Sequence, residues 1–211
     1  MILIDVQEVG VGAGPAPDLP PVTADNTDGG PALVAVGTED GPVLASLVIG
    51  GRYRPDTGGV FLDGRDDTDA LRAAVALVDT PGVAEPAPSL PLGSVVREEL
   101  VFAGLPAGRA AVRQFLHQFG LHAYVSAVVG NVPPTERIRV LAELAILRPG
   151  IRALVITSPE RHGGSTAGWL DVALEMTRRD IAVFVIAGHA AIDDALAHLD
   201  PSVSVAPLGS R

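Results

Sequence analysis

The sequence contains no lysine: all fifteen of its basic residues are arginine. A P-loop, the phosphate-binding loop of many nucleotide-binding proteins, uses a lysine ammonium as a compact charge on the β- and γ-phosphates, and the planar guanidinium of arginine does not replace it. An intact P-loop is therefore excluded. The abundant alanine, glycine and proline indicate a high-GC genome, but this bias alone would not remove a lysine that a working site needs.

Cysteine is also absent, and aromatic residues make up only 4% of the chain. The lack of cysteine excludes disulfides, Cys-ligated zinc, iron–sulfur clusters and thiol catalysis. Hydrophobic residues nevertheless make up 47% of the 211 residues, so the core must consist mainly of valine, leucine, isoleucine and alanine. This length and composition are typical of one globular domain, or of one domain with an inserted subdomain.

Positive charge and long apolar runs are scarce as well. The net charge is −10, and no run of arginines offsets it locally. This charge repels nucleic acid and anionic lipid headgroups at long range, so we predict no nucleic-acid partner. The longest apolar stretch, near residues 181–192, is interrupted by Gly188 and His189 and is shorter than the roughly 20 residues that span a bilayer. We therefore predict no segment that crosses a membrane unaided.

Short β-branched runs alternate with helical patterns along the chain. We predict strands at Ile2–Gln7, Ala32–Val36, Val60–Asp63, Ala74–Val78, Ala153–Thr157, Ala182–Ala187 and Val203–Val205. Two segments rich in proline and glycine, residues 12–21 and 81–91, are predicted to be loops. The pattern indicates a mixed α/β sheet.

Between residues 94 and 148 the hydrophobic period becomes helical. One apolar stripe is formed by Val112, Phe115, Leu116 and Phe119. A further helix is predicted to begin near Pro134 and to end before Pro149, because proline suits a first helical turn and cannot continue a helix. We predict an α/β core formed by residues 1–93 and 149–211, with a helical subdomain inserted at residues 94–148.

Taken in order, several segments resemble the nucleotide-binding domain of ATP-binding cassette (ABC) transporters over nearly the whole chain. The segments that carry the resemblance are Arg54–Gly64, Val95–Leu100, Glu136–Ala142 with Leu147–Pro149, and His189 after the apolar run 183–186. The resemblance implies a P-loop-like core with a mixed sheet and a helical subdomain. It also implies an ATP site at the edge that faces a second cassette, and a groove that receives a short helix from a membrane-spanning partner.

The P-loop position of this family aligns with Gly37–Leu44. Glu39 and Asp40 would oppose a polyphosphate electrostatically. Pro42 lies near the place of the lysine and removes a backbone donor, and Val43 and Leu44 supply no hydroxyl for Mg²⁺.

Other positions that touch nucleotide in the family are also changed. Thr157 aligns with the carboxylate that holds Mg²⁺, and Ser158 aligns with the glutamate that polarises the attacking water. Two prolines, Pro133 and Pro134, occupy the signature segment, and the sensing glutamine falls at Asp79 or Thr80. The positions interpreted as degenerate are Gly37, Gly41, Pro42, Thr157, Ser158 and His189. His189 aligns with the switch histidine, but a histidine that satisfies local backbone groups at a strand end is the favoured interpretation.

These losses predict a protein without catalytic residues, cofactor or metal, which is not an enzyme and neither binds nor hydrolyses ATP usefully. Its role would then be binding. We expect a structural or regulatory subunit that docks on an integral membrane protein, pairs with itself, or pairs with an active cassette. The expected docking residues are Pro81, Pro86, Pro88, Val95, Glu98 and Leu100. The resemblance implies a cytoplasmic location, at the inner face of the cell membrane when the partner is a membrane protein.

Two alternatives remain open at this point. An enzyme of different chemistry could reuse the scaffold if titratable residues converge in one deep pocket. The available pool is Glu39, Asp40, Asp79, His162 and His189. Alternatively, the chain is another α/β domain, which the absence of a helical segment at residues 94–148 would reveal. The acidic residues between Asp63 and Asp69 lack EF-hand spacing and are interpreted as a solvated turn.

Overall fold

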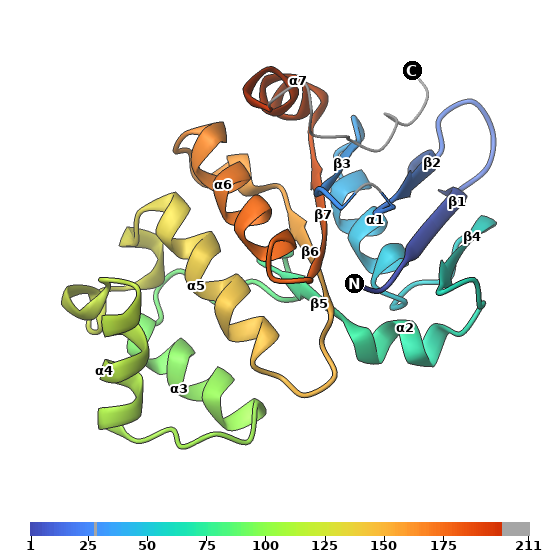
Figure 1. The fold of residues 1–211 in the computed structure, drawn as a ribbon. Coiled ribbons are helices and arrows are strands. Elements are labelled where there is room, and N and C mark those ends of the chain that lie inside the picture. Colours follow the sequence, from blue (N-terminus) through green and yellow to red (C-terminus); the bar gives the residue numbers. More distant parts are fainter. Residues whose placement is uncertain (28, 200–211) are drawn as a thin grey trace.

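The computed structural model describes residues 1–27 and 29–199. Its described part contains two sheets: a three-stranded antiparallel sheet in the order β2-β1-β4, and a four-stranded parallel sheet in the order β3-β7-β6-β5 (Figure 1). The parallel strands are β3 (Ala32–Ala35), β5 (Val75–Val78), β6 (Ala153–Thr157) and β7 (Ala182–Ala187). The prediction of a mixed α/β fold is confirmed. The strand predicted at Val203–Val205 lies outside the described residues.

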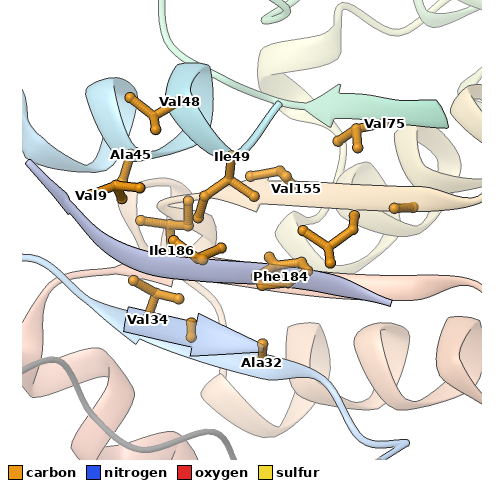
Figure 2. Close-up of a cluster of buried hydrophobic side chains, with 14 of the residues drawn as sticks. Val9, Ala32, Val34, Ala45, Val48, Ile49, Val75, Val155, Phe184 and Ile186 are labelled. Carbon is orange, nitrogen blue, oxygen red and sulfur yellow. The ribbon is translucent and has the colours of Figure 1, made fainter. Parts of the chain in front are cut away.

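The parallel strands are buried along their whole length, because both faces of the sheet are covered. Alternate side chains point to opposite faces. Phe184 and Ile186 of β7 pack with helix α1 (Gly41–Ile49), while Val183 and Val185 pack on the other face. Figure 2 shows the first of these clusters, where Val9 of the antiparallel sheet also joins. The small apolar residues in the sequence therefore fill two layers of core.

The antiparallel sheet is formed by β1 (Ile4–Val11), β2 (Leu19–Asp25) and β4 (Thr57–Leu62). Strand β2 was not predicted, and its first three residues lie in the segment interpreted as a loop. Its prolines, Pro20 and Pro21, hide the strand in the sequence, but proline is tolerated on a sheet edge because one side of the strand needs no ladder donor. Leu19, Val22 and Ala24 are buried; Val22 and Ala24 alternate, whereas a register shift between the Val22 and Leu19 pairings brings Leu19 to the same buried face.

Between β5 and β6 the described chain is helical and contains no strand. The helices are α3 (Leu92–Phe102), α4 (Arg109–Gln118) and α5 (Pro134–Ile146), with short 3-10 helices at His122–Tyr124 and Val129–Asn131. These elements share a small core of their own, in which Val112, Phe115 and Leu116 of the predicted stripe are buried. Helix α5 also packs Ile138 and Ala142 against the parallel sheet.

The remaining helices are α2 (Thr68–Ala74), α6 (Thr166–Thr177) and α7 (His189–His198). Together with α5, helices α6 and α7 lie on the face of the parallel sheet opposite α1 (Figure 1). Across the described ranges, none of the helices is long and apolar enough to cross a membrane.

Candidate functional site

The carboxyl ends of the four parallel strands meet at one edge of the sheet, which is where α/β sheets bind their ligands. The segments that follow the strands there are Gly37–Asp40 after β3, Asp79–Thr80 after β5, Ser158 after β6 and Gly188–His189 after β7. The sequence-predicted degenerate positions therefore belong to one edge of the sheet and to the start of α1.

The loop between β3 and α1 is folded on itself. The Gly41 N–H donates to the Thr38 carbonyl at 3.3 Å, and the Leu44 N–H donates to the Asp40 carbonyl at 3.0 Å. Pro42 has no N–H. Of the first four amide positions of α1, only that of Val43 is left to face a ligand. A phosphate site at a helix start relies on several such amides, so this helix start is poorly equipped for one.

The side chains of the same loop do not compensate. Glu39 and Asp40 are exposed at the start of α1 and carry the same sign of charge as a phosphate. Gly37 lies against the exposed His189, because a Cβ at Gly37 would be 3.0 Å from two atoms of the imidazole ring. The structure thus brings the loop and His189 together.

Three buried hydroxyl groups lie between α1, β6 and the end of β5. The Thr157 oxygen is 2.7 Å from both the Ser46 and Thr80 oxygens, and all three side chains are fully buried. Ser46 donates its single hydroxyl hydrogen to the Pro42 carbonyl at 2.7 Å. Because each hydroxyl has only one hydrogen, Thr157 must donate to Ser46, and Thr80 must donate to Thr157. The three hydroxyls therefore form one directed chain that satisfies its own polar groups. Sequence reasoning found Thr157 but missed Ser46.

The backbone turns sharply where β5 and β6 end. Asp79 has φ of 55° and Ser158 has φ of 45°, in the left-handed region that non-glycine residues seldom adopt. The Ser158 N–H donates to the Ile186 carbonyl at 2.7 Å, and the Arg161 guanidinium donates to the Asp79 carbonyl at 2.6 Å. These hydrogen bonds hold the two turns at the candidate site.

A buried ion cluster joins this edge to the helical segment. Arg137 of α5 donates two hydrogen bonds to the Asp79 carboxylate, Nε to Oδ2 at 2.9 Å and Nη2 to Oδ1 at 2.6 Å. Arg161 lies 3.1 Å from the same carboxylate and also 3.1 Å from the carboxylate of Glu85. The bidentate geometry is the strongest form of this contact. Neither arginine was identified from the sequence, because their partners are distant along the chain.

The cluster sets the protonation of its members. Burial alone would raise the pKa of Asp79, but the hydrogen bonds and charge of Arg137, with the charge of Arg161, lower it below its ordinary value. Burial lowers the pKa of His162; Asp79 acts in the opposite direction and the two arginines reinforce the lowering. Nε2 of His162 is 2.9 Å from Oδ2 of Asp79, but the angles are not those of a hydrogen bond, so this buried nitrogen has no hydrogen-bond partner among the described residues.

Ligand atoms of Asp79, Glu85 and His162 lie within 4.8 Å of one another, a spacing that could surround a metal ion. However, the guanidinium groups of Arg137 and Arg161 already neutralise both carboxylates and would repel a cation. The cluster therefore serves to join the surrounding segments through ion pairs. Five residues were considered for an enzyme of different chemistry. The ion cluster contains two of them, Asp79 and His162. The other three, Glu39, Asp40 and His189, are exposed elsewhere along the edge.

A groove of about 470 Å³ lies beside the junction of the parallel sheet and the helical segment. Its walls come from the end of β5, the loop at residues 83–90, α3 and α5. Pro86, Val95 and Glu98 of the predicted docking residues line it. Leu100 is instead buried in the helical core, because it lies on another face of α3. Of the two other prolines, Pro88 accepts a hydrogen bond from the Gly130 N–H, and Pro81 follows Thr80 into a tight turn.

Comparisons with known proteins give a likeness in structure alone. No protein-family model matches the sequence, and no curated protein is similar to it in sequence. The structure is similar to a nucleotide-free ATP-binding cassette from an ABC transporter, with a TM-score of 0.66 and 18% identity over 95% of this chain and 86% of that chain.

Two further solved structures give the same result. An ATP-binding cassette of an ABC transporter in its ADP conformation has a TM-score of 0.62 and 15% identity over 89% of this chain and 82% of that chain. The cbiO1 protein from Clostridium perfringens, part of the ABC transporter complex cbiONQ, has a TM-score of 0.65 and 15% identity over 99% of this chain and 86% of that chain. The chain therefore has the cassette fold, as predicted.

One prediction is overturned by this likeness. The chain was predicted not to be an enzyme, on the strength of the altered nucleotide positions. The solved structures that share its fold are ATP-binding cassettes and a component of an ABC transporter complex, so the comparison contradicts that prediction. Altered positions in an aligned motif are weaker evidence about activity than they seemed in the sequence, because a fold can place substitute groups at a site from elsewhere in the chain.

Proposed function

We propose that the chain is a cassette-like subunit whose groove docks a segment of an integral membrane protein. The observation that carries this proposal is the presence of three exposed apolar side chains, Val83, Leu90 and Phe102, in the lining of the groove. Among the described residues, eight large hydrophobic side chains are exposed, and five of them lie between residues 83 and 105. They are Val83, Leu90, Val101, Phe102 and Leu105.

An apolar patch of this kind marks an interaction surface, because its burial against a partner removes apolar area from water. Phe102, at the end of α3, is 62% exposed and lies in the groove lining. The guanidinium of Arg148 lies 5.8 Å from the centre of its ring and is itself paired with Glu99. The ring is thus held in place with one side open, which suits it to act as an anchor for a partner.

The groove is also preorganised. The ion cluster ties Glu85, on the groove loop, to Arg161 after β6, and ties Asp79 to α5. The four prolines at positions 81, 86, 88 and 91 restrict the backbone of the same loop. A stiff site loses less conformational entropy on binding, so this loop is suited to bind a partner without rearrangement.

We also propose how the chain is divided into subdomains, which partner it meets at the sheet edge, and how strongly it holds a nucleotide. We assign residues 1–93 and 149–211 to the core and residues 94–148 to a helical subdomain, with the groove between them. A second copy, or an active cassette, is the expected partner at the edge that carries the Gly37–Gly41 loop. That loop is proposed to hold a triphosphate weakly, because it offers few amides and two carboxylates. The proposed location is the inner face of the cell membrane, through the partner.

The docking proposal is tested by cross-linking in native membranes. A photo-cross-linking amino acid at position 102 is expected to form an adduct with a membrane protein. The same amino acid at position 53 is the matched control, because Tyr53 is also an exposed aromatic residue but does not line the groove. Val83→Asp should reduce the adduct at position 102 at least fivefold. Equal adducts from positions 102 and 53, or none with a membrane protein, would contradict the proposal.

A further inference from the structure

Three arginines line one hollow on the helical segment. Arg97 of α3 and Arg109 and Arg113 of α4 surround a space of about 340 Å³, together with Ser94 and Ser126. No carboxylate belongs to this lining. That is unexpected for a chain with 25 acidic and 15 basic residues, in which a random surface hollow should contain more acid than base.

The arrangement is electrostatically unfavourable in the absence of a ligand. No ion pair within the described residues involves Arg97, Arg109 or Arg113. Arg109 and Arg113 are four residues apart on α4, so their like charges lie on the same face of the helix and repel each other. Arg109 is also the first residue of α4, where the helix dipole favours acidic residues. The fold thus concentrates positive charge at a local cost in stability.

We propose that this hollow binds a phosphate group, carried either by a soluble ligand or by a lipid headgroup. Guanidinium groups form paired hydrogen bonds with phosphate oxygens, and three of them neutralise its charge. The Ser94 and Ser126 hydroxyls add neutral donors on the same lining. The hollow is within the size range of small-ligand sites.

The hollow and the docking groove share helix α3. Ser94 and Arg97 line the hollow, whereas Val95 and Glu98 line the groove. A helical repeat of 3.6 residues places these two pairs on neighbouring faces. The hollow requires no docking partner, so the phosphate site stands independently of the proposed function. If the groove does face a membrane protein, a lipid headgroup is within reach of the hollow.

The test uses the purified chain and two probes. Titration calorimetry with inorganic phosphate at low salt measures the soluble source. Sedimentation with phosphatidylcholine vesicles, with and without phosphatidylglycerol, measures the headgroup source. The variant R109Q/R113Q removes two charges from the hollow. R65Q/R178Q is the matched control, because it removes two charges from exposed arginines that do not line the hollow.

The wild-type chain is expected to bind at least one probe saturably. R109Q/R113Q should weaken that binding at least tenfold, whereas R65Q/R178Q should change it less than twofold. Binding to phosphate alone assigns a soluble ligand, and binding only to anionic vesicles assigns a headgroup. Equal losses in the two variants, or no saturable binding to either probe, would overturn the proposal. Circular dichroism of both variants shows whether they remain folded.

Discussion

At the scale of single residues, the Asp79–Arg137 pair is the most consequential contact in the candidate site. Both side chains are almost completely excluded from solvent, and the pair joins the end of β5 to α5. A buried ion pair contributes little net stability compared with apolar residues, but the loss of one partner leaves an uncompensated buried charge. Each of the two residues therefore needs the other to compensate its charge in the buried site.

The first prediction follows from this dependence. Arg137→Met should lower the free energy of unfolding by about 3 kcal/mol, because Asp79 stays buried with only Arg161 as counter-charge. Arg139→Met, on the same helix, removes a more exposed pair with Glu175 and should cost less than about 1 kcal/mol. Urea denaturation of both variants measures the difference. Restoration of stability in Asp79→Asn/Arg137→Met would identify the unpaired charge as the cause, and equal effects of the two single variants would contradict the buried pair.

The same cluster shows the limits of inference from sequence at this scale. Asp79 and His162 were each named as titratable residues near strand ends, but nothing in the sequence connected them with Arg137 or Arg161. The four residues span more than eighty positions, and only the parallel order of β5 and β6 brings them together. Pairing of this kind is a property of topology.

At the scale of elements, the buried strands and the helices of residues 92–146 could be predicted well, because their hydrophobic periods are clear. Strand β2 could not, since two prolines masked its alternation. The hydroxyl chain was also missed: Ser46 is an interior residue of α1 with no motif around it, and its meaning comes only from the approach of β6. The stretch Gly37–Leu44 was expected to follow a strand, as it does, but neither the start of α1 at Gly41 nor the hydrogen bonds of the loop were foreseeable.

The loop and α1 together give a prediction about nucleotide. Mg-ATP should bind with a dissociation constant weaker than about 1 mM, because few amides and no lysine face the phosphates. E39Q/D40N should tighten binding by about two- to threefold through reduced repulsion. D193N/D194N is the control, since it removes the same charge from exposed positions of α7. Calorimetry measures affinity, and phosphate release in the same samples measures turnover. Micromolar affinity of the wild-type chain would contradict this account of the loop.

At the scale of the whole molecule, the net charge and the burial of His162 have opposite effects on the stability of the folded state as pH falls. The net charge of −10 means that mild acidification reduces self-repulsion and should favour the folded state. His162 acts in the other direction. Its pKa is lowered in the folded protein, so below about pH 6.5 the unfolded chain binds the proton more readily and stability is lost. The carboxyl of Asp79 adds a similar loss only at much lower pH, since its pKa is already lowered.

The difference between wild type and His162→Gln isolates the histidine contribution. Between pH 7 and 5 the wild-type chain should lose stability relative to this variant, with a slope of at most about 1.4 kcal/mol per pH unit for one proton. His198→Gln, at an exposed position of α7, is the control for the replacement of a histidine as such. Chemical denaturation at stepped pH measures the three curves. Parallel curves for wild type and His162→Gln would show that the folded state does not depress this pKa.

Helix α5 has a consequence for how the molecule folds. Val140 and Leu144 complete the helical core, and Ile138 and Ala142 complete the core beside the parallel sheet. Unfolding of either core would expose apolar side chains of α5 to water. The two halves should thus share one cooperative melting transition, and a lesion in either should lower the apparent melting temperature of both.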